Sequence, residues 1–164
     1  ADSVGSGTGS QGNMTHVTWV TRRLQTEVID DIGGSVSGNQ ISLPAGTYWV
    51  DGWAIQGAIS SIGYSAAATL YSTFRLRNVT DGITLVNGGT NLFYIDNAAS
   101  SSGATSNGQS YTPYIIKGKF TIAALKLIEL QHYVSVTNGS INAGAAIGSG
   151  ENEKYAELTF WKIA

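Results

Sequence analysis

The amino-acid sequence predicts an all-β protein, and three observations lead to this fold class. Apolar and polar residues alternate with a period of two along several segments, whereas no stretch of about 11 or more residues keeps the 3.6-residue period of a helix. Turn signals such as Pro44-Ala45-Gly46 and Asp81-Gly82 separate these segments. The chain also has 21 glycines and only 12 % charged residues, which suits strands joined by many turns. About eight to ten strands in a chain of this length predict a sandwich, a jelly roll or a barrel.

The expected elements follow in chain order. Residues 1–13 are mostly Gly and Ser without a period, which predicts a flexible linker ahead of a single domain spanning 14–164. Asn87-Gly88-Gly89 predicts a hairpin or a bulge between two short strands. The expected strands are 17–22, 41–43, 47–55, 69–78, 84–86, 91–95, 114–122, 126–137 and 154–163. Long connections at 59–68, 96–110 and 142–150 are poor in charge, and each is either a functional loop or a tolerated surface insertion.

Length and charge exclude several function classes. The 164 residues fit one domain, and 9 basic against 11 acidic residues leave no excess of positive charge for binding nucleic acid. The absence of cysteine excludes disulfides, a thiolate metal site and a cysteine nucleophile. No apolar run approaches the ~20 residues of a membrane span, so membrane insertion is not expected.

Residues suited to catalysis are sparse, and we expect no enzyme activity, cofactor or metal. His16 and His132 are far apart in the sequence, and His132 has the parity of a core residue, which favours a buried, hydrogen-bonded histidine. Asp30 and Asp31 are adjacent in the chain, so in a strand they would point to opposite faces and make a poor acid–base pair. Either this pair or Glu151 with Glu153 could join a calcium site, but neither has the spacing of a known calcium loop.

The parity of three strands separates a core face from a second face. In 126–137 the even positions are Ile128, Leu130, His132 and Val134, and the strands 69–78 and 154–163 also have apolar even positions. The opposite faces combine large aromatic residues with few charges, which is typical of subunit interfaces. They predict an obligate oligomer whose interface contains Tyr71, Arg75, Glu129, Tyr133, Tyr155 and Trp161, with Arg75 and Glu129 as a candidate ion pair. The alternative is an amphipathic sheet that exposes a few aromatic side chains.

Carbohydrate recognition is the positive candidate for ligand binding. Sugars are bound by flat aromatic faces together with uncharged hydrogen-bonding groups, and the loop regions supply both. The candidate residues are Tyr64, Asn97, Asn107, Gln109, Tyr111, Asn138 and Asn142. Trp49 and Trp53 would add a stacking face if one of them is exposed, and the alternative is that both pack under the loops.

Four segments together resemble a known family. They are QTEVIDDIGGSVSGNQISLPAGTYWVDGWAI at 25–55, FRLRNVTDG at 74–82, GKFTIAALKLIELQHYV at 118–134 and YAELTFWKIA at 155–164. The set is similar to the globular domain at the C-terminus of phage tail-fibre and tailspike proteins. It also resembles the tumour-necrosis-factor and complement globular-head superfamily, in which the last strand closes the inner sheet.

The resemblance implies a jelly roll of about ten strands assembled as a homotrimer, with the outward face of the inner sheet packed around the threefold axis. It implies a virion protein that joins an upstream fibre segment and attaches to a bacterial surface polysaccharide or other receptor through distal loops. Two alternatives stay open: a cap that trimerises and registers the fibre without a ligand, or the carbohydrate-binding domain of a depolymerase.

Overall fold

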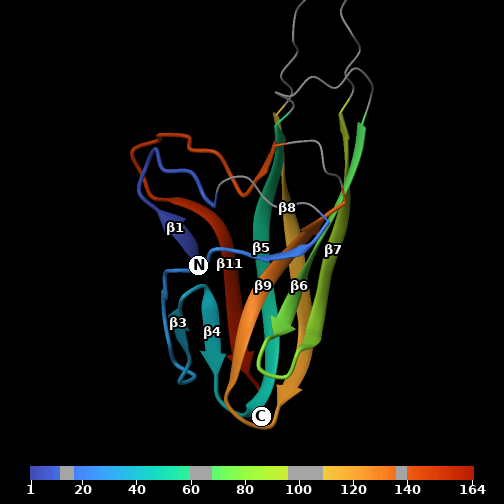
Figure 1. Ribbon diagram of the computed structural model, residues 1–164. Coiled ribbons are helices and arrows are strands. Elements are labelled where there is room, and N and C mark those ends of the chain that lie inside the picture. The colour runs from blue at the N-terminus through green and yellow to red at the C-terminus, as the bar shows by residue number, and fades with distance from the viewer. Residues whose placement is uncertain (12–16, 60–67, 96–108, 136–139) are drawn as a thin grey trace, which may run out of the picture.

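The computed structural model describes residues 1–11, 17–59, 68–95, 109–135 and 140–164. These residues contain strands and no helix, and all the strand pairs are antiparallel, which confirms the all-β prediction. The strands form two sheets that pack on one another as a β-sandwich (Figure 1).

The first sheet, here sheet A, is built around a long central strand. This strand, β5, pairs along its length with β8 on one side, and with β11 and β10 in turn on the other, while β1 pairs with β11. The bounds of its strands are β1 (Asp2–Val4), β5 (Gly46–Ile59), β8 (Gln109–Ile122), β10 (Ser140–Asn142) and β11 (Glu153–Lys162).

The second sheet, sheet B, has the order β3-β4-β9-β6-β7, and β2 also pairs with β9. Its strands are β2 (Trp19–Thr21), β3 (Ser35–Ser37), β4 (Gln40–Leu43), β6 (Ala68–Asn78), β7 (Ile83–Ile95) and β9 (Lys126–Val134). Because β7 is continuous, Gly88 and Gly89 form neither a hairpin nor a strand end. They lie at a bulge where the pairing shifts between Thr73 and Arg75, and the bulge was one of the two expected outcomes.

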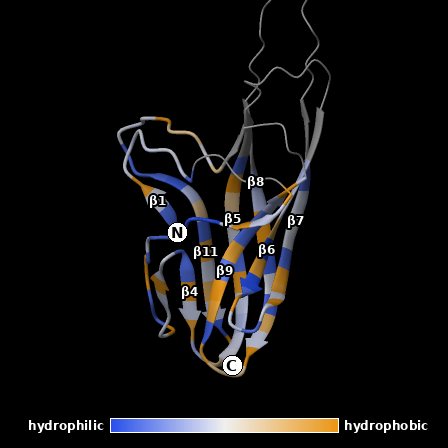
Figure 2. Cartoon of the chain, in the orientation of Figure 1, coloured by the Kyte–Doolittle hydropathy of each residue, from blue (hydrophilic) through white to orange (hydrophobic). Residues whose placement is uncertain are grey.

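The core lies between the sheets and follows the expected parity. Ile128, Leu130 and Val134 of β9 are buried, as are Phe74 and Leu76 of β6. Burial of each such side chain contributes ~1.5–3 kcal/mol, so the inward faces supply most of the driving force for folding. Figure 2 shows hydrophobic and hydrophilic residues alternating along the strands.

One end of the core is polar. The side chains of Arg22, Gln56 and His132 are fully buried, and Arg22 donates from Nη2 to the carbonyl oxygen of Ala143 at 3.1 Å. Burial lowers the pKa of Arg22 to about 10, so the guanidinium stays protonated at neutral pH. His132 is buried as expected, but its ring nitrogens have no hydrogen-bond partner among the described residues.

The start of the chain differs from the linker predicted for residues 1–13. Asp2–Val4 is a strand paired with β11, and Asp2 is fully buried beside Arg23, with 2.7 Å between Oδ1 and Nε. Ser10 and Gln11 bond to Gly144 and Ala143. Residues 1–11 are therefore part of the sandwich, because a buried ion pair and backbone pairing hold a segment that has no apolar period.

Candidate functional site

The outward face of sheet A carries three of the four tryptophans of the chain. Along β5, Tyr48, Val50 and Ala54 point into the core, so Trp49 and Trp53 point outward. Trp161 has the same orientation on β11, where Ala156 is buried. We call this surface the tryptophan face, and it consists of Trp49, Asp51, Trp53, Ile115, Lys117, Lys119, Glu157, Thr159 and Trp161.

Strand register arranges the tryptophan face in three rows across β11, β5 and β8. One row is Trp161, Trp49 and Lys119, because Trp49 pairs with both of the others. The middle row is Thr159, Asp51 and Lys117. The third row is Glu157, Trp53 and Ile115. Neighbouring strands lie ~4.8 Å apart, so the aromatic side chains of adjacent strands form a broad surface.

Charge on this face is largely paired. Lys117 Nζ lies 2.7 Å from Asp51 Oδ2 in the middle row, and Lys154 Nζ lies 3.0 Å from Glu157 Oε1 at the edge. The exposed fraction is 38 % for Trp49, 48 % for Trp161 and 62 % for Ile115. Such a surface can bury apolar area against another protein, or stack against the apolar face of a sugar ring.

This geometry decides between the two expectations for Trp49 and Trp53. Both lie on the outward face of β5, and Trp49 is exposed while Trp53 is half-buried. The alternative that both pack under loops is wrong for Trp49.

The outward face of sheet B carries a second cluster, centred on Arg75. The Arg75 guanidinium lies 3.9 Å from the centre of the Trp19 ring, and the Trp19 and Tyr133 rings are 5.5 Å apart. Arg75 donates from Nη2 to Gln131 Oε1 at 2.7 Å, and Gln131 Nε2 donates to Glu129 Oε2 at 2.7 Å. Gln131 therefore lies between Arg75 and Glu129. Its side-chain amide bonds to both residues, where a direct ion pair between them was expected.

The residues expected at the subunit interface fall on both sheets. Tyr71, Arg75, Glu129 and Tyr133 belong to the outward face of sheet B, whereas Trp161 belongs to the tryptophan face. Tyr71 is 51 % exposed, and Glu129 is nearly buried, accepting hydrogen bonds from Thr21 and Gln40. These residues therefore make two separate surfaces.

Tyr155 does not lie on either surface, contrary to expectation. It is buried, and its hydroxyl bonds to Glu153 and to the carbonyl oxygens of Thr8 and Ala145. The start of the chain and the segment before β11 cover this part of the sheet, so the parity of β11 does not expose the ring.

The residues expected to bind a glycan are placed only in part. Tyr64, Asn97, Asn107 and Asn138 lie outside the described residues. The backbones of Gln109 and Tyr111 lie in β8 and that of Asn142 lies in β10, so these three are strand residues where loops were expected. Gly57 of β5 pairs with Tyr111 on one side and with Asn142 on the other.

The acidic residues considered for calcium have other partners. Asp30 Oδ1 accepts hydrogen bonds from the backbone N–H groups of Ile32 and Gly34. Glu153 accepts from the N–H groups of Gly7, Ile147 and Gly148, and from the Tyr155 hydroxyl. Over the described ranges, no group of three or more His, Cys, Asp or Glu residues is placed to hold a metal ion.

Sequence reasoning considered Trp49, Trp53 and Trp161 separately and missed the surface that they share with Ile115. Trp161 pairs directly with Trp49, and Ile115 pairs directly with Trp53. The signal was the odd parity of all three tryptophans, but only the strand register shows that β11, β5 and β8 are neighbours.

No family model matches the chain, and a search of curated proteins finds no match. The described residues include no helix that is long and apolar enough to cross a membrane.

Proposed function

We propose that this chain is the trimeric host-attachment tip of a phage tail fibre or tailspike, which binds a bacterial surface glycan without catalysis. The observation that carries the proposal is the tryptophan face. Exposed large apolar side chains on neighbouring strands are typical of surfaces that another protein covers, and aromatic residues are enriched at the centres of such interfaces.

The strand order supports the jelly roll that the sequence resemblance implies. In that family the last strand closes the inner sheet, and the outward face of this sheet packs around the threefold axis. The last strand here is β11, which lies between β1 and β5 in sheet A and carries Trp161 on its outward face. We therefore propose that the tryptophan face packs around the axis and that the Arg75 cluster of sheet B points away from it.

The strand ends support a glycan-binding tip. Ile59 pairs with both Gln109 and Ser140, and Ala68 pairs with Ile95. The segments 60–67, 96–108 and 136–139 therefore join strand ends that lie at one end of the sandwich (Figure 1). These segments contain Tyr64, Asn97, Asn107 and Asn138. Three equal sites at one end of a trimer would convert weak binding into strong attachment through high effective concentration.

A second candidate function uses the same surface differently. If the protein is a monomer, the tryptophan face is left open to solvent, and a tryptophan platform flanked by the paired Asp51 and Lys117 suits sugar stacking. Quenching of tryptophan fluorescence by soluble polysaccharide in a monomeric protein would support this second function. It would argue against the trimer.

The test of attachment is binding to an array of bacterial surface polysaccharides. We expect the protein to bind at least one glycan, and a variant carrying both Asn97→Ala and Asn107→Ala to lose binding while keeping its oligomeric mass. Asn152→Ala is the control, because Asn152 is exposed and lies outside the three segments. An intact trimer that binds no glycan would contradict attachment and favour the alternative role of a fibre cap.

A further inference from the structure

The polar end of the core contains buried side chains whose polar atoms are largely unpaired. Arg22, Gln56 and His132 are each 0 % exposed. Among the described residues, no hydrogen-bond partner exists for Nε and Nη1 of Arg22, for either atom of the Gln56 amide, or for either ring nitrogen of His132. Buried polar groups in folded proteins are nearly always hydrogen-bonded, because an unpaired group is costly. These atoms therefore indicate that a further group completes the site.

The three side chains come together between the two sheets. Val20 pairs with His132, so Arg22 lies diagonally across from His132 on the inward face of sheet B, and the charge of Arg22 acts on the His132 ring. From there the Arg22 guanidinium reaches sheet A, where Nη2 donates to the carbonyl oxygen of Ala143 at 3.1 Å. Ala143 follows the strand β10 that pairs with β5, and this register places it beside Gln56.

No carboxylate of the described residues bonds to Arg22. Its pKa of about 10 keeps the guanidinium protonated at neutral pH, so a positive charge lies in the core. The buried carboxylates are Asp2, Glu129 and Glu153, and each has other partners. Asp2 raises the pKa of Arg22 as a nearby charge, but its hydrogen bond goes to Arg23. Glu129 bonds to side chains on the outward face of sheet B, and Glu153 bonds to backbone N–H groups.

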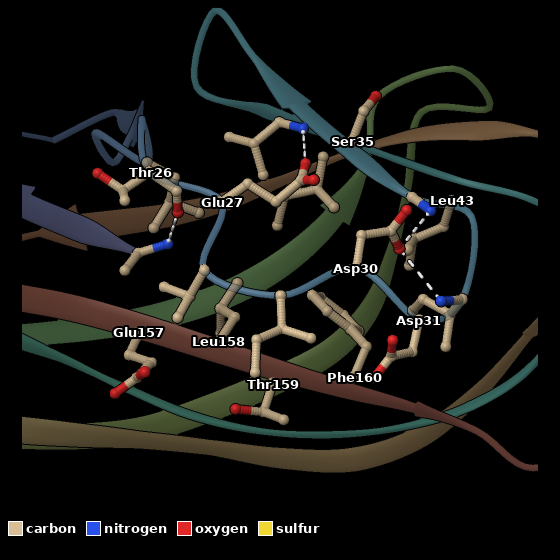
Figure 3. Close-up of a pocket in the computed structure, with 18 of the residues that line it drawn as sticks. Thr26, Glu27, Asp30, Asp31, Ser35, Leu43, Glu157, Leu158, Thr159 and Phe160 are labelled. Atoms are coloured by element: carbon tan, nitrogen blue, oxygen red, sulfur yellow. Dashed lines mark hydrogen bonds between the residues drawn. The ribbon is translucent and has the colours of Figure 1, made fainter.

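Other carboxylates gather away from this site. A cleft beside β11 is lined by Glu27, Asp30, Asp31 and Glu157, whereas Arg22 is not among its lining residues (Figure 3). Three of these groups also have partners of their own, because Glu27 and Asp30 accept from backbone N–H groups and Glu157 accepts from Lys154. The charge of Arg22 is therefore not neutralised from this direction.

The chemistry of the unpaired atoms favours an anion. A guanidinium offers only donors, an amide offers two donors and one acceptor group, and a neutral imidazole offers one of each. Burial, followed by the charge of Arg22, lowers the pKa of His132 to about 3, so its ring is neutral at neutral pH. N–H groups thus outnumber acceptors, and a water molecule would leave the charge of Arg22 uncompensated. Complete burial favours a small monovalent anion, and chloride is cheaper to dehydrate than the smaller fluoride.

We propose that the polar end of the core binds one chloride-sized anion, which accepts hydrogen bonds from the Arg22 guanidinium and the Gln56 amide beside the His132 ring. Nη2 of the same guanidinium bonds to the carbonyl oxygens of Ala143 and Tyr155, at 3.1 and 3.4 Å. The anion therefore holds in place the side chain that connects sheet B to β10 and β11 of sheet A. This inference depends on neither the proposed trimer nor the proposed glycan.

Thermal unfolding in sodium chloride and in sodium fluoride tests the proposal. An anion that binds only the folded state stabilises it, so we expect the midpoint to be about 5 °C higher in chloride than in fluoride, each at about 100 mM. Bromide should act like chloride. Gln56→Glu places a carboxylate beside Arg22 in place of the anion, so this variant should have the same midpoint in both salts. Gln25→Glu is the matched control, because Gln25 is exposed, and it should keep the difference between the salts.

A crystal of the unmodified protein grown in bromide locates the anion directly. We expect an anomalous bromide peak in contact with Arg22 and Gln56. Ordered water at that position, equal midpoints of the unmodified protein in chloride and fluoride, or a chloride effect that persists in Gln56→Glu would overturn the inference. If Gln56→Glu does not fold, the bromide crystal decides between anion and water. Oligomeric mass and glycan binding are measured separately, so the proposed function keeps its own test.

Discussion

Glu153 shows how one buried side chain can organise a chain segment. Hydrogen bonds from the Tyr155 hydroxyl and from the N–H groups of Gly7, Gly148 and Ile147 lower the pKa of this carboxyl to about 2. The same contacts fasten residues near the start of the chain to the segment before β11. The ionised carboxylate is therefore part of the structure that covers Tyr155.

The folded pKa of Glu153 lies below its usual value of 4.5, so its stabilising effect is complete above that pH and is lost as pH falls toward 2. We predict that Glu153→Gln lowers the thermal midpoint at pH 7 and removes part of the acid-induced loss of stability. Scanning calorimetry between pH 7 and 2 measures this. Glu151→Gln, at an exposed neighbour, should behave like the unmodified protein, and an unchanged acid profile in Glu153→Gln would contradict the assignment.

His132 gives a second pH-dependent contribution. Burial, followed by the charge of Arg22, lowers the pKa of His132 to about 3 from 6.5. The unfolded chain then binds a proton that the folded chain does not, so stability is complete above pH 6.5 and decreases as pH falls toward 3. The slope of this contribution is about 1.4 kcal/mol per pH unit where only the unfolded state is protonated.

We predict that His132→Phe removes this slope between pH 6 and 4 with little loss of stability at pH 7. The ring nitrogens have no partner among the described residues, and the ring packs 6.0 Å from that of Phe74, so an apolar ring suits the site. Urea unfolding at several pH values measures the slope. A variant whose stability depends on pH as steeply as before would contradict the prediction.

At the scale of elements, β1 is an edge strand of sheet A and has only three residues. Its position depends on Asp2, which is fully buried against Arg23, an arginine that is 20 % exposed. Removing one partner of a buried ion pair leaves an uncompensated charge, which is far more costly than losing an exposed pair.

We predict that Asp2→Ala lowers the free energy of unfolding by about 3 kcal/mol. Lys154→Ala is the comparison, because it removes an ion pair whose side chains are 40 % and 33 % exposed, and it should cost less than about 1 kcal/mol. Chemical denaturation measures both. Equal losses in the two variants would show that β1 contributes little to the sandwich.

The strands also show what a sequence can and cannot predict. Alternation found the core faces of β6, β9 and β11, since Phe74, Leu130 and Ala156 are buried as expected. It failed for β1, because that strand is held by Arg23 and by β11, and neither partner is visible in a segment of Gly and Ser. Alternation also failed to predict the burial of Tyr155. Other segments of the chain cover this outward position, and their presence leaves no periodic pattern in the sequence of β11.

At the scale of the whole molecule, the two outward faces differ in how many of their side chains have contacts within the same chain. The Arg75 cluster of sheet B is a connected network with internal hydrogen bonds and ring contacts. The tryptophan face of sheet A leaves Trp49, Trp161 and Ile115 exposed. The sequence could suggest tryptophans with a shared parity, but the rows that bring Trp161 beside Trp49 come from long-range pairing.

We predict that Ile115→Glu dissociates the proposed trimer, because it buries a charge on the tryptophan face beside Trp53. Leu125→Glu is the matched control, since both side chains are 62 % exposed and Leu125 lies in the turn before β9. Native mass spectrometry at equal protein concentration measures the fraction of trimer. Similar dissociation in both variants, or in neither, would contradict a subunit interface at Ile115.

The most direct test of the central claim is the solution mass of the unmodified protein by size-exclusion chromatography with light scattering. The tryptophan face packed around a threefold axis predicts a mass three times the 17.2 kDa of one chain, constant down to micromolar concentration. A stable mass of 17.2 kDa at that concentration would contradict the account, because the exposed tryptophans would then have no partner subunit.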